Sequence, residues 1–397
     1  MKIYQKSLFL LFVSVIVGGA VYIAIPQLQF FRVMLILFLF ITFLELSKNS
    51  FKLDFNSKLL LIWFSIYYFW TIYLSLPIKI DFNSYINFNI IYILVIVLIL
   101  NMNYNTKKFL DTLYKALYFM FYVMLGVAIW EIVTHHHLKV ATFFDHAPEY
   151  IQFQPSTFYT NPNDFMAMLT LLIIFLFGYK KILKYKIGVY DYIMLLVTFV
   201  LSFITNSRIV MMVLALTFLI ISFKKKNIKY LFFIVVLLIG LFVYIMGLDN
   251  NDINYLLAGL SFGGDSTSIR EHLYIDALLS IQHNFGMGYG INNSYLYYQQ
   301  LNDPNLEGII NPHNYLLEIL INSGVYVTFL YLLLNLYFIY LFIKNNQFFL
   351  VYMIIIYEIV LISSSSSIFL WFQYVYYISI LGLYSISTKK VIYAKGS

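Results

Sequence analysis

The sequence predicts an all-α polytopic membrane protein with about 12 transmembrane helices and a large outer loop that carries short helices. Two observations predict this fold class. Of the 397 residues, 62% are hydrophobic and only 11% are charged, with a mean hydropathy of +0.82, whereas soluble domains are about a quarter charged. The apolar residues also fall in runs of about 20, the length that crosses a bilayer core, separated by short polar breaks.

The predicted spans follow these runs in order. The first comes after Lys2 and Lys6 and is too long for the apolar core of a signal peptide, so we interpret it as an uncleaved helix. The runs at 192–205 and 230–246 are apolar on all sides, unlike the alternating strands of a membrane barrel. We treat 1–397 as one membrane domain. The spans cover residues 7–25, 30–46, 59–76, 84–102, 112–133, 162–178, 189–206, 208–223, 229–247, 314–343, 348–364 and 367–387.

The basic residues predict the orientation. If the N-terminus is cytoplasmic, 20 of the 25 lysines and arginines fall on the cytoplasmic side, as the positive-inside bias favours. Both termini are therefore expected in the cytoplasm. The five basic residues left outside include all three arginines of the chain: Arg32, Lys79, Lys139, Arg208 and Arg270.

The arginines are candidates for specific chemistry, because lysine is the default cation of this chain. A planar guanidinium can contact phosphate through two parallel hydrogen bonds. The alternative is that each arginine only extends its charged group to the membrane interface.

Two outer loops are long, at 134–161 and at 248–312. The second, between spans nine and ten, is too long for a structureless connection and is expected to form its own helices. Ser268 and Glu271 have the spacing of a capping box, which predicts a helix beginning there with Arg270 in its first turn.

Polar motifs gather where spans meet the outer boundary. Each is weak alone: Asn-Pro before an apolar run is an ordinary helix start, and the glycine triplet lacks the strand of a dinucleotide site and predicts a tight loop. The motifs are Asn161-Pro162-Asn163-Asp164, Asn206-Ser207-Arg208, Gly286-Met287-Gly288-Tyr289-Gly290 and Asn311-Pro312-His313-Asn314.

Together, and in this order, the motifs resemble the O-antigen polymerase and O-antigen ligase superfamily of bacterial polysaccharide assembly. The resemblance covers residues 161–325 and is one of arrangement. Its pieces are Asn-Pro-Asn at 161–163, Thr-Asn-Ser-Arg at 205–208, Ser-Ile-Arg-Glu at 268–271, the glycine triplet, Pro-His-Asn-Tyr-Leu-Leu-Glu at 312–318 and Ser323-Gly324.

The resemblance implies a metal-independent, GT-C-like glycosyltransferase without a cofactor. Such an enzyme takes a glycan from undecaprenyl diphosphate at the outer face of the bacterial inner membrane. Its functional residues correspond here to Arg208 and Arg270, which would bind the diphosphate and stabilise it as leaving group, and to His313. Histidine titrates near the working pH, so His313 is the candidate general base for the acceptor hydroxyl.

Further residues at the same boundary are predicted to bind substrate. Asn314 and Glu318 are one helical turn apart and share a face. The expected partners are the undecaprenyl-diphosphate-linked glycan, an acceptor glycan, the lipid bilayer and a chain-length regulator, with no nucleic acid. The predicted substrate-binding residues are Asn161, Asn163, Asn314, Glu318 and Arg32.

Alternatives remain open at this stage. We favour a polymerase of O-antigen or capsule repeat units; an O-antigen ligase would use the same donor and a lipid A core or other acceptor. A transporter of the lipid-linked oligosaccharide should have repeated halves and midplane polar groups, but here the polar groups cluster at the outer boundary and the midplane holds little beyond Glu358. Glu358 is either functional or a hydrogen-bonded packing residue. Three consecutive histidines, 135–137, do not converge on one metal ion without other ligands.

Overall fold

The computed structural model contains twelve α-helices and no β-strand in the part of the chain that it describes. That part comprises residues 2–18, 29–47, 52–76, 82–141, 154–222, 265–291, 297–298, 314–361 and 371–395. The helices are α1 (Lys2–Val17), α2 (Phe30–Leu46), α3 (Phe55–Ser75), α4 (Phe82–Tyr104), α5 (Thr106–Thr134), α7 (Pro162–Ile182), α8 (Val189–Ile204), α9 (Arg208–Ser222), α12 (Asp265–His283), α14 (Tyr315–Lys344), α15 (Phe348–Leu361) and α16 (Phe372–Lys395).

The all-α prediction is confirmed for these residues, and eleven of the predicted spans coincide with a helix. The ninth, 229–247, lies outside the described residues. Five helices, namely α3, α4, α5, α7 and α14, are long and apolar enough to cross a membrane, and four shorter ones are also apolar. The remaining helix, α12, lies within residues 248–312, so the prediction that this segment carries helical structure is also confirmed.

Several helix ends differ from the predicted bounds, and two helices, α1 and α12, show why. α1 begins at Lys2 rather than at residue 7 and ends at Val17, where Gly18 has a φ of +59°, a left-handed conformation that ends helices. α12 begins at Asp265, three residues before Ser268, so Arg270 lies in its second turn. The capping-box prediction was therefore wrong, and an acidic residue is itself favourable in the first turn of a helix.

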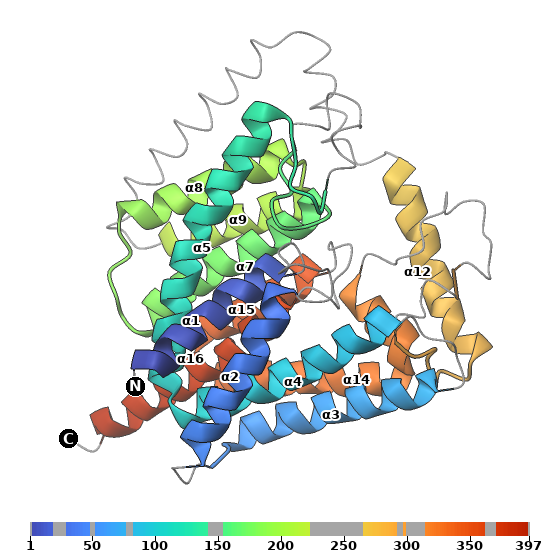
Figure 1. The fold of residues 1–397 in the computed structure, drawn as a ribbon, viewed down its shortest axis with the longest axis horizontal. Helices are drawn as coiled ribbons and strands as arrows, with labels where there is room; N and C mark the ends of the chain where they lie inside the picture. The colour runs from blue at the N-terminus through green and yellow to red at the C-terminus, as the bar shows by residue number, and fades with distance from the viewer. Residues whose placement is uncertain are drawn as a thin grey trace.

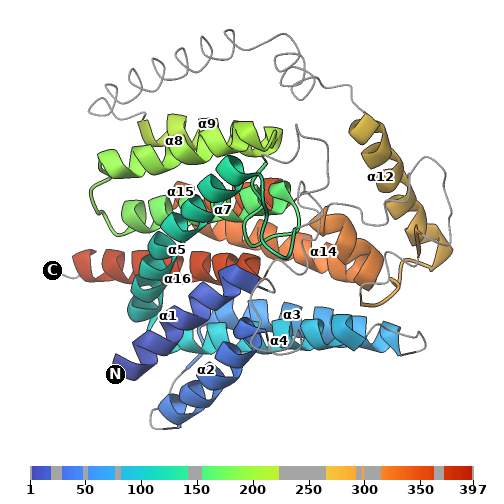
Figure 2. The same ribbon diagram turned by 45° about the horizontal axis from the view of Figure 1, so that its top comes forward.

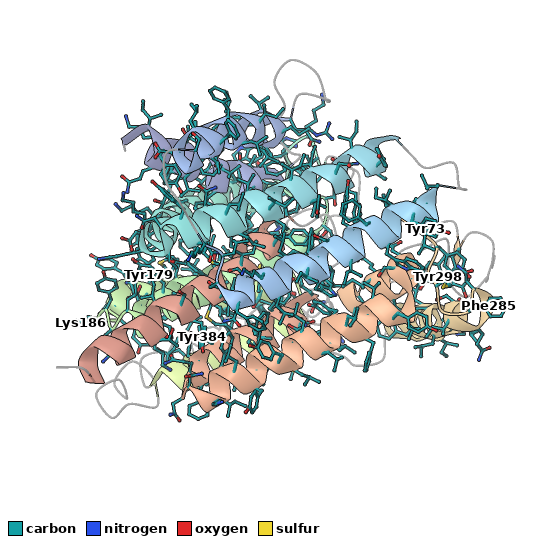
Figure 3. The ribbon with its side chains drawn as sticks, turned by 90° about the horizontal axis from the view of Figure 1, so that it is seen from below. Tyr73, Tyr179, Lys186, Phe285, Tyr298 and Tyr384 are labelled. Carbon is teal, nitrogen blue, oxygen red and sulfur yellow. The ribbon has the colours of Figure 1, made fainter. Side chains whose placement is uncertain are left out.

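The helix termini lie at two opposite ends of the bundle. Both chain termini lie at one end, which we call the terminal end, and α12 lies at the other, the α12 end (Figures 1 and 2). At the terminal end Lys180 on α7 forms an ion pair with Asp191 on α8, with 2.5 Å between Nζ and Oδ1. Figure 3 shows Lys186 and Phe285 at these two opposite ends.

α7 is the central helix of the bundle. In its most apolar window 83% of the residues are buried, more than in any other long apolar helix described. It packs against α5, α8, α9, α15 and α16. Gly178 allows α15 to approach closely, because a Cβ at this position would lie 2.6 Å from Met353 Sδ. The start of α7 is therefore held at a fixed place at the α12 end.

Candidate functional site

α12 is anchored on the first half of α14. Leu273 and Ala277 on α12 share a small buried cluster with Ile321 on α14 and with Tyr297 and Tyr298. The Tyr298 hydroxyl donates to the Leu273 carbonyl oxygen at 2.8 Å, and the Tyr297 hydroxyl donates to the Asp276 carbonyl oxygen at 2.9 Å. Burial raises the pKa of both phenols, so both stay protonated and able to donate.

The glycine triplet after α12 fills a break in α14. At the break Gly324 has a φ of +84° and a ψ of +175°. Tyr289 and Gly290 donate their backbone N–H groups to the carbonyl oxygens of Ile321 and Asn322, and Val325 N–H donates to Gly286 O, each at 2.8 Å. The loop thus supplies partners for backbone groups that the interrupted helix leaves unpaired.

Three glycines are needed in this loop. Gly286, Gly288 and Gly290 have φ values of +72°, +93° and +91°, a region that other residues rarely adopt. A Cβ on Gly288 would lie 2.6 Å from Gly324 N. The prediction of a tight loop is therefore confirmed, and its tightness is explained by the backbone packed against it.

α3 holds the other side of the same loop. Trp70 Nε1 donates to Met287 O at 3.2 Å, and Ile291 N–H donates to Ser75 Oγ at 2.7 Å. Residues 286–291, held between α3 and α14, are called the glycine clamp below. The clamp fixes the position of α12 relative to the start of α14.

Asn314 and Glu318 form the first turn of α14, as their spacing predicted. Asn314 caps the helix, because its Oδ1 accepts from Leu316 N at 3.0 Å and from Leu317 N at 3.3 Å. Glu318 is 4% exposed. Its charge helps to raise the pKa of Tyr298, after burial and the charges of Asp276 and Tyr297.

The region where α12 packs against the first half of α14 is called the corner below. Arg270 and His313 lie next to it in the sequence. The backbone of Arg270 lies on α12, under one turn before Leu273, whose carbonyl oxygen holds Tyr298. His313 directly precedes Asn314. The Arg270 side chain and all of His313 lie outside the described residues, so their predicted roles stay predictions.

Arg208 begins α9 at the same end of the bundle. The turn before it contains Asn206 with a φ of +54°, and the Arg208 side chain is half-buried. α9 packs against α7, α8 and α15, and α15 also packs against α14. The N-terminus of a helix favours anions, so the guanidinium and the helix start act in the same direction here.

Asn161 and Asn163 lie at the start of α7. Asn161 Oδ1 caps the helix by accepting from Asn163 N at 2.7 Å. Asn161 and Asn314 thus both use their carbonyl oxygens as helix caps, a role that explains Asn at these positions without a substrate. Their NH2 groups are not used in the caps, and substrate binding by either residue remains a prediction.

Glu131 is a structural residue that the sequence did not single out. It is fully buried near the end of α5, and its Oε2 accepts from Ser156 N at 2.9 Å and from Thr157 N at 2.8 Å. Tyr159 in the same segment donates to Ile16 O at 2.9 Å. A lone acid at the end of an apolar helix was the available signal, but its two shorter hydrogen bonds come from residues about 25 positions away in the chain.

Arg32 lies at the start of α2, away from the glycine clamp. Its Nη2 donates to Asn87 Oδ1 on α4 at 2.7 Å. Asn87 lies in the second turn of α4, so Arg32 is held near the start of that helix.

The other acidic and histidine candidates have structural partners. Glu358 on α15 accepts hydrogen bonds from the Tyr331 hydroxyl and from Asn335 Nδ2, which supports the packing interpretation. His135 ends α5 with a φ of +56°, and His137 Nε2 lies 3.1 Å from Gln154 O. Within the described ranges, no three His, Cys, Asp or Glu side chains gather as a metal site would require.

A comparison with known protein families identifies the segment of the chain that contains this corner. Residues 192–332 match the family model described as O-antigen ligase. This segment is an O-antigen ligase domain. The resemblance drawn from the motifs is thereby confirmed for this segment. No curated protein and no solved structure matches the chain.

The O-antigen ligase domain contains most of the predicted site. It runs from α8 to the second half of α14 and includes the glycine clamp. Arg208, Arg270, His313, Asn314 and Glu318 lie inside it. Arg32, Asn161 and Asn163 lie outside it, in the helices packed around the domain.

Proposed function

We propose that the chain is a polymerase that joins undecaprenyl-diphosphate-linked oligosaccharide repeat units into O-antigen or capsule. The forms of the Asn-Pro-Asn and Pro-His-Asn motifs favour a polymerase over a ligase, and one structural observation carries the glycosyl-transfer chemistry that both share. Within the O-antigen ligase domain, the glycine clamp fixes the helix of Arg270 against the first turn of α14, directly after His313. The locked backbone would hold the cation of Arg270 near the base His313, which suits a reaction in which one bond forms as another breaks.

The proposed reaction uses each residue for one task. The acceptor hydroxyl attacks the anomeric carbon of the donor sugar, and His313 takes the hydroxyl proton. The bond from that carbon to the lipid diphosphate breaks, and its electron pair stays on the diphosphate. Arg208 and Arg270 bind the diphosphate and stabilise the added charge, the task for which other enzymes use a divalent cation.

The proposed topology puts this chemistry outside the cytoplasm. We propose twelve crossings in a GT-C-like bundle, with both termini cytoplasmic. The α12 end would then face outward, where lipid-linked repeat units are polymerised. The bias of the lysines toward the opposite side supports this orientation.

An O-antigen ligase is the second candidate, favoured by the description of the matched family. It would use the same donor and pass the glycan once to a lipid A core or another acceptor. The glycine clamp and the arginines would serve that reaction equally well.

Reconstitution distinguishes these functions. Purified protein in liposomes is given undecaprenyl-diphosphate-linked repeat units, and the products are separated by gel and mass spectrometry. A polymerase gives a ladder of lipid-linked chains without any other acceptor. Product that appears only with lipid A core, as a single addition, would instead identify a ligase, and movement of the lipid with no new glycosidic bond would identify a transporter.

A further inference from the structure

An apolar groove runs between α2 and α4 and has no part in the corner described above. It holds about 590 Å³. Ile36, Phe40 and Phe43 of α2 form an exposed wall, and the buried side chains of Thr42 and Val97 form the floor. Figure 2 shows α2 at the outer edge of the bundle, so the groove opens toward the surrounding lipid.

Polar contacts mark both ends of the groove. At the α12 end Arg32 is bound to Asn87 at 2.7 Å, and it precedes Ile36 by one helical turn on the same face of α2. Toward the terminal end, Asn101 Nδ2 donates to Thr42 Oγ1 at 3.0 Å and Tyr4 donates to Asn101 Oδ1 at 2.7 Å. A cation thus stands at one end of an apolar track, and a neutral polar cluster stands near the other.

The length of the track distinguishes between kinds of lipid. Ser47 also lines the groove, and it lies about 22 Å from Arg32 along the helix axis at 1.5 Å per residue. Half of a bilayer core is only about 15 Å thick. A phospholipid with its headgroup at Arg32 would leave the far part of the track empty, whereas a long isoprenoid chain would fill it.

We propose that Arg32 and this groove form a second lipid site, which binds the undecaprenyl diphosphate of the acceptor. The inference rests on the proposed polymerase function. Both substrates of that reaction carry an undecaprenyl diphosphate, and Arg208 and Arg270 serve only the one that leaves. The acceptor keeps its lipid throughout, so its diphosphate needs a cation away from the reacting bond, and its chain needs an apolar track.

A matched pair of leucines on α2 tests the site. Leu39 lines the groove and is 43% exposed, while Leu37 does not line it and is 52% exposed. Native mass spectrometry of the full chain in detergent, with undecaprenyl diphosphate as probe, should detect two bound molecules in the wild type and in Leu37→Trp. In Leu39→Trp the affinity for one of them should fall at least about tenfold, because the indole fills the track, a change of about 1.4 kcal/mol.

The headgroup and the chain length provide two further tests. Arg32→Gln, which can still donate to Asn87, should lower the affinity for the same bound molecule as Leu39→Trp does. Arg208→Lys should lower the affinity for the other molecule. Inorganic pyrophosphate, which has no chain, should bind the second site equally in wild type and Leu39→Trp. Unchanged affinity for both bound molecules in Leu39→Trp, or equal occupation of the groove by phosphatidylglycerol, would overturn the proposal.

These measurements need no turnover, so they are separate from the test of the polymerase. A wild-type protein that forms no polymer but binds two undecaprenyl diphosphates would contradict the proposed function alone. Normal polymer formation by the Leu39→Trp variant would contradict the proposed second lipid site but not the proposed polymerase function.

Discussion

Gly288 lies directly against Gly324, although the two belong to different segments of the chain. A Cβ added to Gly288 would lie 2.6 Å from Gly324 N and 2.7 Å from the carbonyl carbon of Ser323. Both glycines have positive φ values. The contact joins the end of the α12 segment to the break in α14, so a side chain at position 288 must push the two apart.

Gly288→Ala should therefore impair transfer more than folding. The left-handed backbone alone costs about 1–2 kcal/mol for a residue with a Cβ, and a shift of about 1 Å at the corner can lower a rate about 10²-fold. Gly126→Ala is the matched control, since Gly126 lies in α5 with no heavy atom near its added Cβ. Transfer assays and thermal unfolding of both variants test this, and equal activities would contradict it.

Lysine at Arg208 or Arg270 should impair transfer despite keeping the charge. A compact ammonium cannot make the two parallel hydrogen bonds that a guanidinium makes to diphosphate. Donor binding should weaken together with turnover, because the diphosphate is present in the ground state and the transition state alike. Near-normal polymer from both lysine variants would indicate that the arginines only reach for the interface.

His313→Ala should fold and still bind donor but lose turnover by about 10²- to 10⁴-fold, the usual effect of losing a general base. In the wild type the rate should rise with pH as the histidine loses its proton, and the variant should lack that rise. Rates measured from mildly acidic to mildly alkaline pH, with and without chelator, check both points. Wild-type polymer from His313→Ala would place the base elsewhere.

Single cysteines can test the orientation, because the chain has no cysteine of its own. Phe285 is 91% exposed beside the glycine clamp, and Lys186 lies at the opposite end (Figure 3). In intact cells an impermeant thiol reagent should label Phe285→Cys and leave Lys186→Cys unlabelled until the membrane is opened. The reverse pattern would invert the proposed topology.

Alkaline pH should loosen α12. Burial raises the pKa of Tyr298 in the folded protein above its unfolded value of about 10. The protonated phenol therefore stabilises the fold at lower pH, and this contribution is lost as the pH rises above about 10. Tyr298→Phe should be less stable at neutral pH by about 1 kcal/mol and should decline less steeply above pH 10.

Limited proteolysis after α12 across this pH range measures the effect. Tyr73→Phe is the control, since Tyr73 lies at the same end of the bundle (Figure 3) and is 61% exposed. If Tyr73→Phe flattens the pH profile as much as Tyr298→Phe does, the effect does not arise from the anchor of α12.

Apolar runs sufficed to predict most helices, because span length is set by the bilayer. Tertiary partners were harder to predict. The glycine triplet indicated a tight loop, but nothing local to it pointed to Gly324 or Ser75. Glu131 was overlooked for the same reason, since the backbone groups it binds come from the next loop. The local sequence pattern also predicted the wrong start for α12. The helix begins at Asp265, although Ser268 and Glu271 have the better capping-box spacing.

The break at Gly324 also sets a depth. Residues 325–344 of α14 number 20 and are about 30 Å long, enough to cross the hydrocarbon core by themselves. The nine residues before the break, 315–323, are therefore not needed for that crossing, so the start of α14 can lie at the membrane surface. A diphosphate whose lipid is anchored in the membrane can then reach the corner while it stays in the headgroup region, and the attached sugars extend into water.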